Sequence, residues 1–145
     1  MGGPSCPGNA LATATLKKAA IARAGFEYQD LVGIEVLINF FRDPTLYQWV
    51  ELESEEPQVG YLDDVVAART DGRFEYIQVK FTSDPDAYML GWDWLLERKP
   101  RGTSRLKKWS SSLLKIAALG PVYIAQLRTN RRPDPEFQTH STGAA

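Results

Sequence analysis

Apolar residues recur with two different periods along the chain, and the change of period separates predicted helices from predicted strands. Residues 10–24 are rich in alanine and favour a helix, which Gly25 is expected to interrupt. In residues 26–41 large apolar side chains recur every three or four positions, which predicts a second helical stretch. Pro44 then ends the pattern, because a proline disfavours the helical conformation of the residue before it.

Three strands are predicted next. Residues 47–53 alternate between apolar and polar positions, and residues 60–81 contain two further apolar runs. The dipeptide Asp71-Gly72 separates these runs and predicts a hairpin turn, because glycine adopts positive φ without a steric clash. The two strands of this hairpin are therefore expected to be antiparallel.

The second strand of the hairpin has two different faces. Because side chains alternate along a strand, Gln78 and Lys80 are expected on one face, after the aromatic residues Phe74 and Tyr76. The opposite face is apolar and consists of Ile77, Val79 and Phe81. Two polar residues at the end of a strongly apolar strand need a structural or a functional explanation.

The C-terminal half predicts two helices and a last strand. Residues 88–97 form a short aromatic helix, and residues 105–119 form a longer one with Ser104 as its N-cap. A Gly-Pro pair ends that helix, and residues 122–127 read as a further apolar strand. Because a right-handed crossover makes the last strand parallel to its neighbour, the predicted fold is α/β, a sandwich around a mixed sheet.

Length and composition limit the class of protein. A chain of 145 residues with 24% charged and 43% hydrophobic residues is typical of one soluble domain. We expect flexible tails at residues 1–9 and 138–145 and a folded domain at residues 10–137. No membrane span or signal peptide is predicted, and the single cysteine fits a reducing, cytoplasmic compartment. One cysteine and one histidine disfavour a Cys/His zinc site and a Ser-His or Cys-His catalytic pair.

Oxygen-bearing side chains are predicted to gather where the hairpin begins. Asp63 and Asp64 open a buried strand, where a carboxylate needs a partner or a metal ion. Further oxygens expected at this corner are those of Glu51, Glu53, the Gln78 side chain and the Val79 backbone carbonyl. Such oxygens suit Mg²⁺ or Mn²⁺, and Lys80 beside them would hold a water or offset phosphate charge. This combination predicts metal-assisted phosphodiester hydrolysis.

A structural explanation is open for each of these residues. Asp63 and Asp64 suit a turn, and Lys80 suits a solvated strand end. For Gln29, the spacing alone favours an ordinary exposed helix residue. The residue pattern alone therefore leaves a catalytic and a purely structural interpretation open.

Segments along most of the chain carry a family resemblance. They are Gly25-Phe26-Glu27-Tyr28-Gln29, Asp63-Asp64-Val65-Val66, Gln78-Val79-Lys80-Phe81, Trp109-Ser110 and Leu127-Arg128-Thr129-Asn130-Arg131. Together they resemble the PD-(D/E)XK nuclease superfamily, in the variant that has Gln at the second acidic position. More closely, the chain is similar to the N-terminal double-stranded DNA nuclease domain of bacterial anti-phage defence effectors, including those of CBASS-type systems. The resemblance implies a restriction-endonuclease-like αβββαβ core.

The same resemblance implies roles for individual residues. The implied catalytic residues are Asp64, Gln78 and Lys80, with Gln29 beside them. The implied ligands of Mg²⁺ or Mn²⁺ are Asp64, Gln78, Glu53 and the backbone carbonyl of Val79. Asp64 is preferred to Asp63 because it directly precedes the apolar run, as the family's acid does. The implied protein is a double-stranded DNA endonuclease that forms homo-oligomers on activation and carries a C-terminal sensor domain.

A basic segment is the predicted DNA contact. Residues 98–108 contain Lys and Arg but no acid. The residues expected to bind phosphates are Arg101, Arg105, Lys107 and Lys108. No base-reading element is apparent, so little sequence specificity is expected. A solvated helix face explains the same charges. Two other functions therefore stay open: an inactive nuclease fold that serves as a DNA-binding or oligomerisation module, and a protein-interaction domain.

Overall fold

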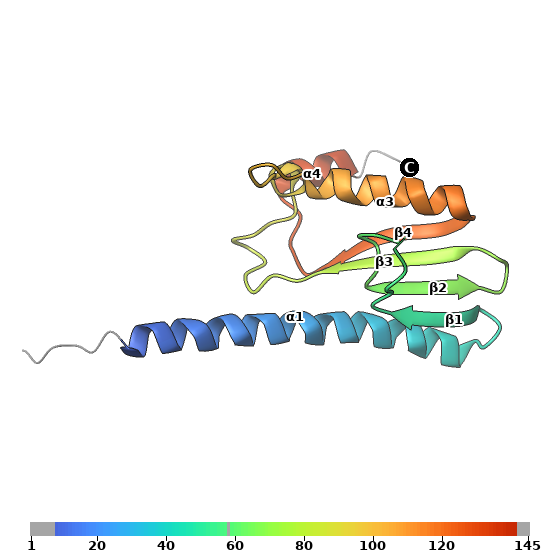
Figure 1. Cartoon of the computed structure of the whole chain (residues 1–145), viewed down its shortest axis with the longest axis horizontal. Helices are drawn as coiled ribbons and strands as arrows, with labels where there is room; N and C mark the ends of the chain where they lie inside the picture. The colour runs from blue at the N-terminus through green and yellow to red at the C-terminus, as the bar shows by residue number, and fades with distance from the viewer. Residues whose placement is uncertain (1–7, 58, 142–145) are drawn as a thin grey trace, which may run out of the picture.

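A four-stranded mixed sheet has helices on both of its faces in the computed structural model, which describes residues 8–57 and 59–141 (Figure 1). The elements in chain order are α1 (Gly8–Arg42), β1 (Tyr47–Leu52), β2 (Val65–Arg69), β3 (Phe74–Lys80), α2 (Trp92–Leu96), α3 (Arg105–Leu119), β4 (Val122–Thr129) and α4 (Pro135–Ser141). The predicted α/β class is therefore confirmed. No helix in these two ranges is both long and apolar enough to cross a membrane.

The sheet has the strand order β1-β2-β3-β4. The β1–β2 and β2–β3 pairs are antiparallel, whereas β3 and β4 are parallel. The turn between β2 and β3 contains Gly72 with φ 82°, as the Asp-Gly signal predicted. The parallel pairing predicted for the last strand is also confirmed.

Each face of the sheet has its own apolar cluster, because α1 and α3 lie on opposite sides of it (Figure 1). Towards α1 the buried residues are Val32, Val36, Tyr47, Val65, Ala67, Ile77 and Val79. Towards α3 they are Val59, Leu62, Val66, Tyr76 and Ile116. The alternation predicted along β3 is thus confirmed, since Ile77 and Val79 face α1 and Tyr76 faces α3.

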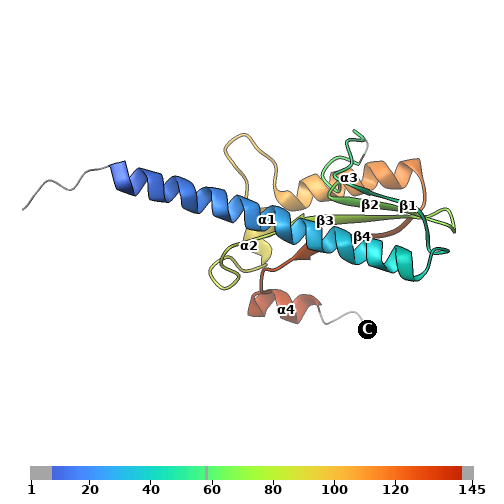
Figure 2. The ribbon, with the colours of Figure 1, turned by 90° about the horizontal axis from the view of Figure 1, so that it is seen from below.

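The predicted interruption at Gly25 is wrong, because α1 is one continuous helix of 35 residues. A single glycine costs a helix only about 1 kcal/mol relative to alanine, and the packing of α1 on the sheet outweighs that cost. The N-terminal part of α1 extends beyond the sheet (Figure 2). The helix begins at Gly8, so residues 8 and 9 of the predicted N-terminal tail are helical, and residues 1–7 lie outside the described part of the chain.

The helix predicted over residues 88–97 is shorter than expected. α2 begins only at Trp92, because Leu90 forms a β-bridge with Pro133 instead of a helical turn. The N–H of Leu90 donates to the carbonyl of Arg132 at 2.7 Å, and the N–H of Asp134 donates to the carbonyl of Leu90 at 2.9 Å. This pairing ties the segment before α2 to the segment before α4.

The chain is helical where the sequence predicted the start of a flexible tail at Gln138. α4 runs through Ser141, and residues 142–145 lie outside the described part of the chain. Asp134 explains the helix start, because its Oδ1 accepts the N–H of Phe137 at 2.7 Å. Pro135 suits the first helical position, and Phe137 packs against Trp92.

Candidate functional site

Three neighbouring residues at the end of β3 converge on the carboxylate of Asp64. Asp64 lies directly before β2, and the pairing of Val65 with Ile77 brings it beside the last residues of β3. The N–H of Val79 donates to Oδ2 of Asp64 at 2.5 Å, and the side-chain amide of Gln78 donates to the same oxygen. Nζ of Lys80 lies 3.9 Å from that oxygen. The hairpin register therefore brings the predicted Asp, Gln and Lys together.

The backbone of Val79 also contributes an oxygen to this corner. In a strand the N–H and C=O of one residue point towards the same neighbouring strand, so the Val79 carbonyl lies on the Asp64 side of β3. Consistent with this direction, Nε2 of Gln78 lies 3.4 Å from the Val79 carbonyl oxygen. The site thus contains a carboxylate, an amide and a backbone carbonyl within reach of one another.

Glu53 reaches the site through a strained backbone conformation. Its φ of 52° lies in the left-handed region, which is uncommon for a residue other than glycine. Its N–H donates to the carbonyl of Asp64 at 3.0 Å, and its Oε1 accepts Nε2 of Gln29 from α1 at 3.0 Å. The strand predicted over residues 47–53 ends at Leu52, and the positive φ of Glu53 lets its side chain reach Gln29 of α1. Gln29 and Glu53 are thereby brought together.

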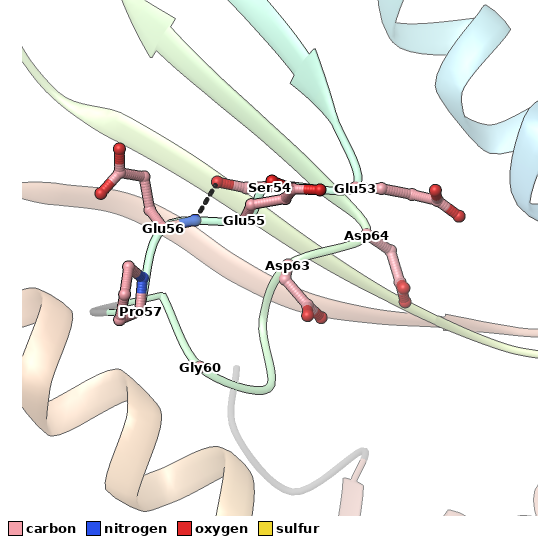
Figure 3. A pocket seen from close by; sticks show the side chains of 8 residues that line it. All are labelled: Glu53, Ser54, Glu55, Glu56, Pro57, Gly60, Asp63 and Asp64. Carbon is pink, nitrogen blue, oxygen red and sulfur yellow. Dashed lines mark hydrogen bonds between the residues drawn. The ribbon is translucent and has the colours of Figure 1, made fainter.

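Two hollows adjoin Asp64 and Glu53, which line both of them. The larger has a volume of about 460 Å³ and is lined by Glu53, Ser54, Glu55, Glu56, Pro57, Gly60, Asp63 and Asp64 (Figure 3). The smaller has a volume of about 240 Å³ and is lined by Gln29, Asp30, Leu52, Glu53 and Asp64. Figure 3 shows Asp63 and Asp64 directed to the same side of their loop and Glu56 directed away from them. The site is therefore open to a ligand and strongly acidic.

The ionisation of Asp64 is opposed by its surroundings. Burial raises the pKa of Asp64 above its ordinary value, and the charge of Asp63 acts in the same direction. The N–H of Val79, the ammonium of Lys80 and the amide of Gln78 each lower the pKa of Asp64, but they do not cancel the effect of burial. A bound cation would stabilise the ionised carboxylate.

The donor set fits a hard divalent cation in its chemistry. Carboxylate, amide and carbonyl oxygens from Asp64, Glu53, Gln78 and Val79 are the ligand types that Mg²⁺ and Mn²⁺ prefer. Gln78 directs its amide nitrogen at Asp64, and rotation of the terminal amide exchanges nitrogen for oxygen. Within residues 8–57 and 59–141 no three His, Cys, Asp or Glu side chains are arranged to hold a metal ion. The predicted set contains only two such side chains, Asp64 and Glu53.

The predicted DNA-contacting residues differ in their surroundings. Arg105 already has partners within the domain, because it forms an ion pair with Glu97 at 2.5 Å and donates to the carbonyl of Trp94 at 2.8 Å. Lys108 instead lies beside the loop that carries Glu53, Glu55, Glu56, Asp63 and Asp64, which we call the acidic loop. Its Nζ lies 5.0 Å from the centre of the Tyr61 ring. The side chains of Arg101 and Lys107 are exposed. Of the four, Lys108 is the one whose contacts link it to the candidate site.

Sequence reasoning missed Ser112, which holds the acidic loop in place. Oγ of Ser112, in α3, accepts the N–H of Tyr61 at 3.0 Å. Nothing in the sequence distinguishes Ser112 from the two serines before it, and only the fold brings it to the loop.

Comparison of the chain with protein-family models, with curated proteins and with solved structures found no match. The functional interpretation therefore depends on the geometry of the site and on the residue pattern.

Proposed function

We propose that this chain is a metal-dependent endonuclease domain that hydrolyses phosphodiester bonds in double-stranded DNA with little sequence specificity. The observation that carries the proposal is the convergence of Gln78, Val79 and Lys80 on the carboxylate of Asp64. The order of α1, β1, β2, β3, α3 and β4 is compatible with the restriction-endonuclease-like αβββαβ core.

The role of each residue follows from its position. Asp64 and Glu53, with the side-chain oxygen of Gln78 and the carbonyl of Val79, would hold Mg²⁺ or Mn²⁺. When bound, such a cation polarises the phosphate and lowers the pKa of water. The ammonium of Lys80 orients the attacking water or offsets the negative charge that develops on the phosphate. Gln29 keeps Glu53 in position through their 3.0 Å hydrogen bond.

The proposed DNA contacts lie on and before α3. Lys108 would bind phosphates next to the acidic loop, with Arg101 and Lys107 extending the contact. Arg105 would reach a phosphate only if it gave up its ion pair with Glu97. Contacts with the DNA phosphates carry no information on the base sequence, which agrees with low sequence specificity.

We further propose that the domain acts in the cytoplasm as part of an anti-phage effector with a C-terminal sensor domain, and that self-association activates it. The family resemblance supports the cellular context. Self-association is supported by exposed apolar residues on α1, at the spacing of a coiled-coil seam: Leu31, Ile34, Ile38 and Phe41.

A second candidate function is an inactive nuclease fold that binds DNA or assembles oligomers. One observation favours it: Oδ2 of Asp64 already accepts hydrogen bonds from Val79 and Gln78, so its hydrogen-bonding capacity is met without a metal ion. Such a module would bind DNA in a salt-sensitive manner and leave it uncut.

Plasmid cleavage separates these two functions. Purified protein is incubated with supercoiled plasmid and Mg²⁺, with and without EDTA, alongside Lys80→Ala and the matched control Lys115→Ala. Lys115 is an exposed lysine of α3 outside the site. We expect relaxed and linear plasmid from the wild type and Lys115→Ala, and intact plasmid with EDTA or Lys80→Ala.

A silent wild type is tested again with Mn²⁺ at high protein concentration, which favours self-association. Cleavage that is still absent, or that survives Lys80→Ala, overturns the nuclease proposal. Salt-sensitive DNA binding by the same samples would then support the inactive module.

A further inference from the structure

The acidic loop, of which residues 53–57 and 59–64 are described, is closed at its base. The N–H of Ser54 donates to the carbonyl of Asp63 at 2.8 Å, and the N–H of Glu53 donates to the carbonyl of Asp64 at 3.0 Å. These bonds continue the β1–β2 pairing beyond both strands. The path of the loop therefore sets the direction from which Asp63 and Asp64 enter the site.

The apex of this loop is anchored on Ser112 of α3. Ser112 is 4% exposed, and its Oγ accepts the N–H of Tyr61 at 3.0 Å. The preceding residue, Gly60, has φ 67°, and a Cβ atom there would lie 2.6 Å from the same oxygen. The backbone conformation favours glycine at this position, and the close approach leaves no room for a Cβ atom.

Further contacts attach the apex to the same side of α3. Val59 and Leu62 are buried in one cluster with Ile116, and Nζ of Lys108 lies over the Tyr61 ring. Lys108, Ser112 and Ile116 follow one another at intervals of four residues along α3, so they share one helix face. One face of α3 thus holds the apex from both sides of the Ser112 hydrogen bond.

We propose that Ser112 is a positioning residue of the candidate site, because its hydrogen bond fixes the loop apex and thereby the placement of Asp63 and Asp64. This inference rests on the proposed nuclease function. Leu62 separates the anchored residue Tyr61 from Asp63, so a shift of the apex moves the carboxylates relative to Gln78 and Lys80. Misplacement of a reacting group by about 1 Å can lower a rate about 100-fold.

The first test replaces Ser112 with alanine and uses Ser111→Ala, an exposed serine one position earlier in α3, as the matched control. We expect Ser112→Ala to lower kcat for plasmid cleavage about 10-fold at unchanged KM for DNA, because the DNA contacts remain. We also expect faster hydrogen exchange at the Tyr61 amide, measured by NMR. Ser111→Ala should match the wild type in all three readouts, and thermal unfolding verifies that both variants are folded.

Gly60→Ala provides an independent variant of the same contact. It should lower kcat more than Ser112→Ala does, because the new Cβ meets Oγ of Ser112 at 2.6 Å. Adding Ser112→Ala to Gly60→Ala should partly restore kcat, because the nearest remaining atom of residue 112 is then Cβ at 3.4 Å. Additive losses would contradict this contact.

The outcomes separate this inference from the nuclease proposal. Active wild type with an unchanged kcat in Ser112→Ala overturns the positioning role and leaves the nuclease function standing. Inactive wild type overturns the nuclease function, and exchange at the Tyr61 amide then decides whether Ser112 holds the loop. Exchange that is identical in Ser112→Ala, Ser111→Ala and the wild type overturns the anchor itself.

Discussion

The electrostatic coupling between Lys80 and Asp64 can be measured without any assumption about catalysis. The perturbations are Lys80→Met, which keeps most of the side-chain stem, Asp64→Asn, which keeps the shape of the carboxylate, and the double variant. The Nζ–Oδ2 distance of 3.9 Å corresponds to about 1 kcal/mol in water and about 4 kcal/mol at an effective dielectric constant of 20. Because the side chain of Lys80 is 41% exposed and that of Asp64 15%, solvent screening favours a coupling of about 1–2 kcal/mol.

The two single variants should change the free energy of unfolding in opposite directions. Burial raises the pKa of Asp64 in the fold above its unfolded value, so its contribution to stability is present at low pH and is lost as pH rises through the folded pKa. At neutral pH the ionised carboxylate therefore destabilises the metal-free protein, and Asp64→Asn should raise the free energy of unfolding. Lys80→Met should lower it, because the carboxylate loses its counter-charge.

The assay is urea unfolding of the four proteins at pH 7 in EDTA, at low salt and at high salt. Lys80→Met should have little effect in the Asp64→Asn background, and high salt should reduce the coupling. A coupling below about 0.3 kcal/mol, which is the usual error of additivity, would refute the close approach of the two charges. The proposed role of Lys80 at the phosphate would fall with it.

Two further predictions concern the fold. Gly25→Ala should raise the free energy of unfolding by about 0.5–1 kcal/mol, because the helix is continuous and a new Cβ would lie 3.8 Å from Phe81. Gly33→Ala should not raise it, because a Cβ there would lie 2.9 Å from Leu52. A loss of stability in urea unfolding of Gly25→Ala would contradict the continuous helix. Burial, with the nearby Glu75, raises the pKa of Tyr47 to about 12 from an ordinary 10.0, so stability should be full below pH 10 and fall as pH rises towards 12. Thermal unfolding across this range should show a smaller fall for Tyr47→Phe, and an equal fall would contradict the assignment.

The elements that were predicted correctly have strong local signals. Ser104 caps α3 as expected, with its Oγ accepting the N–H of Lys107 at 3.3 Å, and the helix covers residues 105–119. The hairpin turn and the alternation along β3 are local in the same sense. Gly25 is also a local signal, but tertiary packing of α1 outweighed it. α4 was missed although Asp134 and Pro135 mark its start, because the packing of Phe137 on Trp92 depends on contacts distant in sequence.

Some contacts of the candidate site could be predicted from local sequence signals, and others could not. Asp64, Gln78 and Lys80 could be expected near one another because a short hairpin fixes their register. The direction of Glu53 could not be expected, since it depends on a positive φ that no sequence signal marks. Ser112 lies 51 residues from Tyr61, the residue whose N–H it accepts, so only the assembled fold reveals that contact.

The buried Glu75 and the half-buried Asp64 have different partners, and the difference bears on function. Glu75 is a structural acid: its oxygens meet Nη1 of Arg69 at 2.5 Å and the hydroxyl of Tyr47 at 3.0 Å. Asp64 accepts hydrogen bonds from neutral donors, and its ion pair with Lys80 is longer, at 3.9 Å. The carboxylates of Asp63 and Glu53 lie around the same hollow. An acid with a purely structural role is expected to have a close cationic partner, as Glu75 has in Arg69. A divalent cation would compensate the excess negative charge around Asp64, and this is the physical reason to prefer the nuclease over the inactive module.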